Sequence, residues 1–172
     1  MQIPVVHSDA NHRRHPTEVV IAISRDTLGR LNPIAIGWST VANQHPPMVV
    51  IAIGTDQHSA HALRHSREFT VAYPSESKAA GTIHIGTVSG ADDDKLSVRG
   101  TPTQPATEID SILLTDAVAN FECVLDGEIV AGDHTLLVGR IVATHMHADP
   151  EVRRLYEVDH FELRGVTVKP SG

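Results

Sequence analysis

Two short apolar segments, separated by a polar stretch that ends in two prolines, constrain the fold of this chain most strongly. Residues 33–38 (PIAIGW) and 48–53 (MVVIAI) are rich in β-branched residues and are bounded by turn-forming residues, which is typical of buried strands. Pro46 and Pro47 donate no backbone hydrogen bonds, so they do not fit a sheet interior. We therefore predict two buried strands joined by a polar loop over residues 39–47, whose amides and side chains can face a ligand.

Other apolar segments predict a mostly β fold with short helical inserts. Further strands are expected over residues 18–24, 68–73, 119–129, 134–147 and 161–168. Short helices are expected over residues 60–65, 76–85 and 92–98, and a turn-rich surface segment over residues 101–112. Ser59 is the expected N-cap of the first helix. Because strands dominate, we predict an all-β dominated fold, an antiparallel closed or split β-barrel with short helices.

Length and charge bound the domain organisation and the partners. A chain of 172 residues fits one domain over residues 1–172, since a chain of this size buries roughly 70% of the surface that its unfolded form exposes. Residues 1–16 show little apolar periodicity, and we expect a flexible arm or a strand swapped into a neighbouring molecule. The net charge of −7 and the lack of a Lys/Arg block argue against nucleic acid as a partner.

Cysteine usage and the length of the apolar runs indicate the compartment. The single Cys123 cannot form an internal disulfide, and its place in an apolar strand favours a buried small residue over a nucleophile. The sequence shows no N-terminal signal segment, and its apolar runs are well short of the about 20 residues that cross a membrane. We expect a cytoplasmic protein without a membrane partner.

A Gly-Asp-His sequence is the sharpest single motif. Gly132-Asp133 predicts a turn that places His134 at the start of a strand, where its imidazole can donate a hydrogen bond to a ligand. An ordinary turn followed by a surface histidine explains the same residues and is the commoner case. The motif alone does not separate the two interpretations.

Two further segments could bind an anion. Gly86 to Gly90 is a loop of small residues followed by Asp94 and Lys95, so backbone amides could approach a phosphate beside a positive charge. His58-Ser59 lies at a predicted helix start, where a hydroxyl and free amides also suit a phosphate, although Ser at this position is more often a simple cap. Each segment alone is a weak signal.

The twelve histidines raise the question of a metal site. His58, His61 and His65 recur at helical spacing, and His145 and His147 share one face of a strand. No second cysteine and no Glu-x-x-His pattern accompanies them, and solvated imidazoles need no ligand. We expect no metal, while retention of a metal through desalting would indicate otherwise.

Taken together, these segments resemble the flavin reductase-like, FMN-binding split-barrel family in one continuous order. The matching residues are Asn32 with Trp38 and Pro46-Pro47, His58-Ser59 ahead of Leu63 and Ser66 to Phe69, Gly86 to Gly90 with Asp94-Lys95, and Gly132 to His134 with Gly139. Each match is weak alone, whereas the order and the spacing make the combination specific. The chain contains no dinucleotide-binding Gly-x-Gly-x-x-Gly motif after a strand, so a Rossmann oxidoreductase is disfavoured.

The resemblance implies an FMN-binding oxidoreductase, an NAD(P)H-dependent flavin reductase in which hydride passes from NADH or NADPH to FMN. It implies a homodimer of Greek-key barrels with FMN at the subunit interface, and a partner monooxygenase or another electron acceptor. Carried over by position, His134 would be the catalytic residue and would face the nicotinamide. The cofactor-binding residues would be Trp38, Ser39, Thr40, Val41, Asn43, His58, Ser59, Ser89, Gly90 and Lys95.

Some residues depart from the pattern of the family. Gln57 stands where many relatives carry Arg or Lys, and Asn43 where Ser is frequent. Ala72 stands where Asn often follows a Phe-x-Val strand. The first departure removes a charge from the phosphate site, for which Arg64 or Lys95 could compensate. The family also contains flavoproteins whose electron acceptor is unknown, so a second hypothesis is an FMN-binding electron carrier or sensor that does not turn over nicotinamide.

Overall fold

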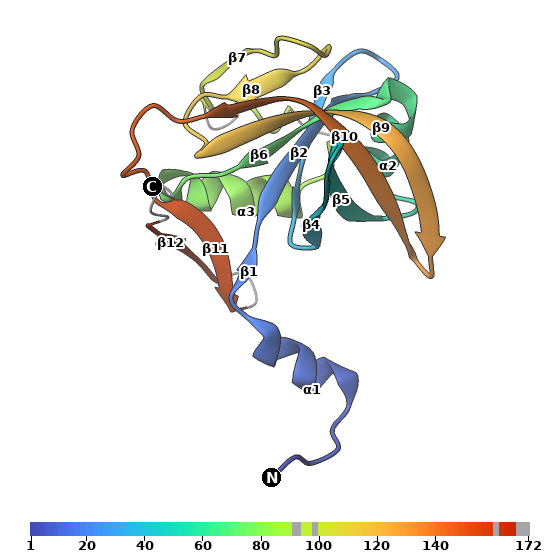
Figure 1. Cartoon of the computed structure of the whole chain (residues 1–172), viewed down its shortest axis with the longest axis vertical. Helices are drawn as coiled ribbons and strands as arrows, with labels where there is room; N and C mark the ends of the chain where they lie inside the picture. The colour runs from blue at the N-terminus through green and yellow to red at the C-terminus, as the bar shows by residue number, and fades with distance from the viewer. Residues whose placement is uncertain (91–93, 98–99, 160–161, 168–172) are drawn as a thin grey trace.

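The computed structural model describes residues 1–90, 94–97, 100–159 and 162–167, and its main element is a curved antiparallel sheet (Figure 1). The sheet has seven strands in the order β3-β2-β6-β9-β10-β5-β4. They are β2 (Val20–Arg25), β3 (Leu31–Ile36), β4 (Ser39–Gln44), β5 (Pro47–Gly54), β6 (Glu68–Tyr73), β9 (Ala119–Ala131) and β10 (His134–Met146). All six pairings within it are antiparallel. The mostly β, antiparallel fold class expected from the sequence is confirmed.

The two edge strands of this sheet are neighbours along the chain. β3 ends at Ile36 and β4 begins at Ser39, so only Gly37 and Trp38 connect opposite edges of the sheet. The sheet must therefore curl until its edges approach each other. The amide of Ala52 in β5 donates a hydrogen bond of 2.9 Å to the carbonyl of Trp38, which joins the connection to β5. The gap between β3 and β5 at this closure is called the seam below.

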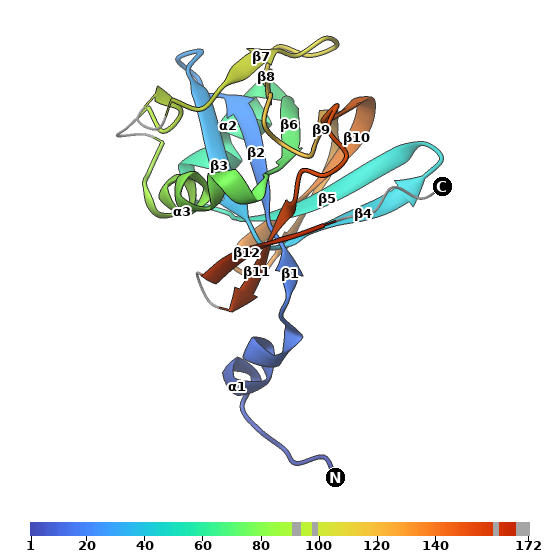
Figure 2. The same cartoon turned by 90° about the vertical axis from the view of Figure 1, so that its left-hand side faces the viewer.

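Smaller elements surround the curled sheet. A three-stranded sheet has the order β1-β11-β12, and β7 pairs with β8. These strands are β1 (Thr17–Glu18), β7 (Thr103–Pro105), β8 (Ile112–Leu114), β11 (Arg154–Asp159) and β12 (Glu162–Val166). The helices are α1 (His7–Asn11), η1 (His12–Arg14), α2 (His58–Ser66), η2 (Glu76–Lys78) and α3 (Ala79–Thr87). Figure 2 shows α3 lying alongside β3, and both views show α1 projecting from the body of the molecule.

The core has two parts, one on each side of β2. Val20 and Ala22 belong to the barrel interior with Ile51 and Phe69, whereas Ile21 and Ile23 pack outside against α3 and β8. This explains why β2 is a continuous apolar run, because both of its faces are covered. Along β5, by contrast, every second residue is buried, as the period of a strand with one buried face requires.

No helix in the described ranges is long and apolar enough to cross a membrane. Cys123 is fully buried in the barrel core, which confirms the expectation of a small core residue. Burial, with a smaller effect of the Glu122 charge, raises the pKa of the Cys123 thiol to about 12. The thiolate that a nucleophile requires is therefore not populated near neutral pH.

The polar segment after Trp38 was expected to be a loop, and this was wrong. Residues 39–44 form β4, and Pro47 begins β5, so only His45 and Pro46 lie between the two strands. β4 is an edge strand whose residues are mostly exposed. An edge strand needs no apolar alternation, which is why its sequence looks like a loop.

Other boundaries also differ from the sequence-based expectations. The arm over residues 1–16 contains α1 and η1, and β11 was not predicted. Ser59 is not the N-cap of α2, because the helix begins at His58 with Gln57 before it. Part of the helix expected over residues 92–98 and the ends of the strand expected over residues 161–168 lie outside the described residues, and the described part of that strand is β12.

A buried carboxylate fastens the segment before β8 to the barrel. Glu122 in β9 is fully buried. It accepts hydrogen bonds from the Thr107 amide and hydroxyl at 2.8 Å, the Glu108 amide at 2.7 Å and His145 Nε2 at 2.7 Å. Burial raises the pKa of Glu122, but the bonds from Thr107, Glu108 and His145 outweigh it, so the pKa lies below its ordinary value. Glu122 therefore stays ionised in the folded protein.

We predict that Glu122→Gln lowers the free energy of unfolding by about 3 kcal/mol at neutral pH, because an amide faces its donors with only one acceptor oxygen. Since the folded pKa is depressed, the contribution of Glu122 is present above the unfolded carboxyl pKa and is lost as the pH falls through the folded value. The difference in the free energy of unfolding between wild type and Glu122→Gln should therefore become smaller in acid. Urea denaturation between neutral pH and pH ~3 measures this.

Glu128→Gln is the matched control, since Glu128 is partly exposed and pairs with Arg64 on the surface. A surface pair of this kind contributes about 0–1 kcal/mol. If both variants lost the same free energy of unfolding at neutral pH, the role assigned to Glu122 would be contradicted.

Candidate functional site

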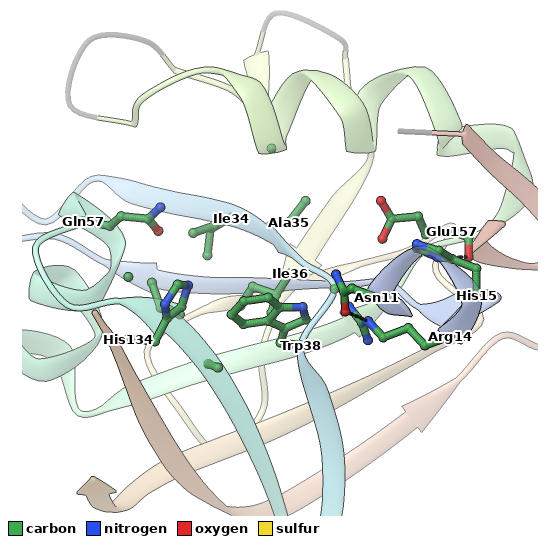
Figure 3. Close-up of a pocket in the computed structure, with 15 residues that line it drawn as sticks. Asn11, Arg14, His15, Ile34, Ala35, Ile36, Trp38, Gln57, His134 and Glu157 are labelled. Atoms are coloured by element: carbon green, nitrogen blue, oxygen red, sulfur yellow. Dashed lines mark hydrogen bonds between the residues drawn. The ribbon is translucent and has the colours of Figure 1, made fainter. Parts of the chain in front are cut away.

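A cavity of about 340 Å³ lies at the seam, and it is called the seam cavity here (Figure 3). Its walls are β3 with the connection to β4, the end of β5, and the start of β10. The lining residues are Ile34, Ala35, Ile36, Gly37, Trp38, Ala52, Ile53, Gly54, Gln57, Gly86, His134, Asn11, Arg14, His15 and Glu157. The cavity is thus mainly apolar and aromatic in its middle and polar at its ends.

Two aromatic side chains meet on the wall of the seam cavity. The ring centroids of Trp38 and His134 are 4.7 Å apart, with planes tilted by 43°. Trp38 keeps 49% of its surface exposed, which is unusual for the one tryptophan of the chain. A half-exposed indole beside an apolar slot offers a surface on which a flat ring can pack.

The turn before β10 orients His134. Gly132 adopts a positive φ of 67°, which allows the tight hairpin turn. Nδ1 of His134 lies 2.7 Å from Oδ1 of Asp133. This hydrogen bond, together with the charge of the imidazole, lowers the pKa of Asp133. With Nδ1 engaged by Asp133, Nε2 is the nitrogen that can contact a ligand.

The N-terminal arm and β11 form the other end of the seam cavity. Asn11, Arg14 and His15 line it together with Glu157, as Figure 3 shows. Arg14 Nε donates to Asn11 Oδ1 at 2.9 Å, and His15 Nδ1 lies 3.3 Å from the Glu157 carbonyl. These four residues were not predicted from the sequence. The only local signal was the run of cationic and imidazole side chains ahead of the first strand.

A second cavity of about 310 Å³ adjoins the first at the start of α2, and it is called the helix cavity here. Its lining residues are Ile34, Gln57, His58, Ser59, Ile85, Gly86, Thr87, Val88, Ser89, Gly90 and Lys95. Ile34, Gln57 and Gly86 line both cavities. An elongated ligand can therefore extend from the seam cavity into the helix cavity.

The helix cavity is rich in hydrogen-bond donors. Gln57 makes no side-chain cap, so the first amides of α2 stay available on the positive end of the helix dipole. Ser59 is buried, and its Oγ accepts a 2.9 Å bond from Asn32 Nδ2. The Ser59 hydroxyl proton therefore remains to donate elsewhere. Gly90 packs so closely on the Asn32 amide that a Cβ there would overlap it.

Lys95 brings a positive charge into the wall of the helix cavity. The residue is buried, and its ammonium donates to the carbonyls of Pro33 at 2.8 Å and Ile85 at 3.1 Å. These bonds fix the charge between β3 and the end of α3. A buried cation beside helix-terminal amides favours an anion in this cavity.

The structure brings most, but not all, of the expected site residues together. Trp38 and His134 line the seam cavity, and His58, Ser59, Ser89, Gly90 and Lys95 line the helix cavity. Ser39, Thr40, Val41 and Asn43 line neither cavity. They lie on β4, where Ser39 donates to Glu18 Oε1 at 2.7 Å and Asn43 to the Pro46 carbonyl at 2.8 Å. The strand that replaces the expected loop directs this segment away from both cavities.

The histidines considered as metal ligands lie on different elements, with His58, His61 and His65 on α2 and His145 on β10. His145 bonds to Glu122, whereas His58 lines the helix cavity. Among the described residues, no group of three or more His, Cys, Asp or Glu side chains is positioned to hold a metal ion.

Comparison with protein families identifies the chain. The model of the flavin reductase like domain matches residues 12–162, which include every residue that lines the two cavities except Asn11. The chain belongs to the flavin reductase family. The family resemblance drawn from the sequence is thereby confirmed, and the matched range contains every expected site residue.

Two archaeal proteins match part of the chain. An uncharacterised protein of Archaeoglobus fulgidus is 28% identical over 115 residues, which are 66% of this chain and 65% of that protein. A protein of Pyrococcus abyssi is 30% identical over 112 residues, which are 65% of this chain and 64% of that protein. The match thus spans somewhat less than two thirds of the length of these relatives.

Solved structures of the family share the fold of this flavin reductase-like chain over nearly its whole length. A flavoredoxin of Methanosarcina acetivorans has a TM-score of 0.84, with 18% identity and 100% and 95% of the two chains covered. An FMN-binding protein of Thermus thermophilus has a TM-score of 0.80, with 21% identity and 96% and 93% covered. An NADH:FAD oxidoreductase of Streptomyces globisporus has a TM-score of 0.79, with 18% identity and 95% and 96% covered. These structures confirm the split-barrel fold.

Proposed function

We propose that this protein is an FMN-binding oxidoreductase that takes hydride from NADH or NADPH. The observation that carries the proposal is the pair of adjoining cavities. One has apolar residues and an aromatic wall in its middle and polar residues at its ends, and the other combines a buried cation with hydroxyl and amide donors. FMN has the same two parts, a flat ring system and a phosphate, joined by a chain. Membership of the flavin reductase family supports the same assignment.

The seam cavity fits the ring of a flavin. Residues of β3 and of the end of β5 line it, together with the half-exposed indole of Trp38. Packing of an aromatic ring on such a surface contributes through buried area and ring contact. Backbone atoms of Gly37 and Gly54 lie in the same wall and can contact the edge of the ring.

The helix cavity fits the phosphate. A dianion needs positive charge or several donors when it leaves water. Lys95 supplies the charge, Ser59 a hydroxyl whose oxygen is already bonded by Asn32, and the start of α2 free amides. Gln57 supplies no charge, so the phosphate depends more on Lys95 here than where a cation occupies that position.

A bound flavin accepts hydride from a nicotinamide and passes the electrons on. The chain itself positions the reactants. His134 holds its ring against Asp133 through Nδ1 and offers Nε2 beside Trp38, where it can bond the carboxamide of the nicotinamide. Orientation of this kind governs the rate of hydride transfer. The name of the Streptomyces structure, an NADH:FAD oxidoreductase, supports a nicotinamide donor.

A second candidate is an FMN-binding electron carrier or sensor without nicotinamide turnover, favoured by the flavoredoxin among the similar structures. The two candidates share the cofactor and differ in the donor. Steady-state oxidation of NADH or NADPH with added FMN separates them. Turnover supports the oxidoreductase, and flavin binding without turnover supports the carrier, with a monooxygenase or another protein as the electron partner.

Exposed apolar residues support the proposed homodimer. Val41 on β4 and Ile129 and Val130 on β9 are more than half exposed, and Trp38 is half exposed. A second copy of the chain could cover these apolar side chains. We predict that light scattering gives about twice the chain mass of 18.6 kDa. A monomer that binds FMN tightly would contradict a site completed at a subunit interface.

We predict that Ser59→Ala weakens FMN about tenfold while sparing riboflavin, which lacks the phosphate. A charge-assisted hydrogen bond contributes roughly 1.5–3 kcal/mol, and one power of ten in affinity corresponds to about 1.4 kcal/mol. Fluorescence titration of each flavin against wild type and variant measures both affinities. Ser97→Ala is the control, because Ser97 lines neither cavity. Equal losses for the two flavins would remove Ser59 from the phosphate site.

We predict that His134→Ala slows reduction by NADH or NADPH about ten- to a hundredfold while FMN affinity stays nearly unchanged. The loss corresponds to roughly 1.4–2.7 kcal/mol of orientation in the transition state. Dithionite needs no nicotinamide pose and should reduce both proteins at the same rate. Anaerobic stopped-flow bleaching of the flavin band gives the rates with each reductant. Unchanged rates of flavin reduction by NADH or NADPH would show that His134 is an ordinary surface histidine.

A further inference from the structure

His58 and Asp26 form a pair at the wall of the helix cavity that the proposed function has not used. His58 is the first residue of α2, and its Nε2 is buried without a hydrogen-bond partner. Oδ2 of Asp26 is 3.7 Å from that nitrogen, slightly beyond a hydrogen bond. Yet 31% of the His58 side chain is exposed, and the residue lines the cavity. One ring nitrogen thus faces a carboxylate, while another part of the ring is accessible to a ligand.

Asp26 supplies a fixed negative charge. Its side chain is 2% exposed. Oδ1 accepts from the amides of Leu28 and Arg30, and Oδ2 from the Arg30 guanidinium, all at 2.8–2.9 Å. Burial raises the pKa of Asp26, but these bonds more than offset that effect, so the pKa lies below its ordinary value. Asp26 is therefore a carboxylate throughout the range in which a histidine titrates.

The charges around His58 balance differently with and without a bound anion. Asp26 in the β2–β3 turn favours a protonated ring, while Arg30 beside it reduces that effect. Lys95 in the cavity wall and the positive end of α2 oppose protonation. On α2 itself, His61 and Arg64 are the next side chains that carry or can carry positive charge. A dianion in the cavity attracts every one of these cations and removes the opposition to a charge on His58.

We propose that His58 takes up a proton from solvent when the flavin phosphate binds, so that its imidazolium bridges Asp26 and the phosphate. The inference rests on the proposed function and adds a residue and a proton to it. A doubly protonated ring has two N–H donors on opposite sides, and a neutral ring has one. Nε2–H satisfies the buried nitrogen by donating to Asp26, and Nδ1–H is then the donor for the phosphate. Asp26 is a positioning residue, because it acts through His58.

This pair also accounts for the uncharged Gln57. His58 becomes a cation only when the phosphate is bound. The empty site therefore does not bury a second permanent positive charge beside Lys95. The consequence is a phosphate affinity that depends on pH through the imidazole. Riboflavin, which has no phosphate, should show no such dependence.

Isothermal titration of FMN in two buffers of different ionisation enthalpy measures the protons taken up on binding. Wild type should take up more protons than His58→Gln at neutral pH. The phosphate of free FMN titrates near pH ~6, but that contribution is common to both proteins and cancels in the difference. His61→Gln is the matched control, because His61 is exposed on the same helix and lines neither cavity.

The affinities give a second readout. His58→Gln should weaken FMN about tenfold near pH 6 and by a much smaller factor near pH ~8.5, with riboflavin unchanged at both. Asp26→Asn should retain FMN binding and require a lower pH for the same proton uptake. Should this variant fail to fold, the His58→Gln series decides alone.

Equal proton uptake and equal FMN-to-riboflavin ratios in wild type and His58→Gln at every pH would overturn the inference and leave the proposed function intact. The absence of saturable binding of either flavin to wild type would overturn the proposed function and the inference together. Proton uptake that persists in His58→Gln would assign the proton to a different group and would equally overturn the role of His58.

Discussion

The short connection between β3 and β4 is the constraint on which the rest of the structure depends. In a flat sheet of seven strands the two edge strands would lie about 29 Å apart, at about 4.8 Å for each pairing. The chain from Ile36 to Ser39 spans at most about 11 Å. The sheet therefore has to curl, and the bond from the Ala52 amide to the Trp38 carbonyl holds the closure. Trp38 lies in this connection, which explains why the indole stays half exposed beside the seam cavity.

The division of the candidate site into the seam cavity and the helix cavity follows from this architecture. The seam provides a slot between backbone segments, which suits a flat ring. The start of α2 and the end of α3 provide donors and a buried cation just beyond it, where Asn32 in β3 holds Ser59 and Lys95 joins Pro33 to Ile85. β3 thus contributes to both cavities, and its fixed position relative to β5 and α2 keeps them continuous. The proposed ring site and the proposed phosphate site are in this way two consequences of the placement of β3.

Local motifs allowed the sequence to predict one part of the site and not the other. Ser59, Gly90 and Lys95, which the structure gathers at the helix cavity, could be predicted because a hydroxyl, a close backbone approach and a cation carry a recognisable chemistry in a short stretch. Arg14 and Glu157 were missed, because the arm meets β11 only through contacts such as His15 with Glu157, 142 residues apart. β4 was taken for a loop because an edge strand carries polar residues on both faces. The role of Ser59 was also misassigned, since its partner Asn32 lies 27 residues away rather than in the same helix.

The fluorescence of Trp38 tests whether a flavin ring packs in the seam cavity. Trp38 is the only tryptophan of the chain, so its emission reports on this one position. Stepwise addition of FMN should quench the Trp38 emission strongly and saturably, reaching its limit at one flavin for each chain, because a flavin packed against an indole accepts its excitation. Riboflavin should reach the same limit at higher concentration. Saturable binding of FMN, followed by flavin fluorescence anisotropy, with unchanged Trp38 emission would contradict the account, because the ring would then lie away from the seam.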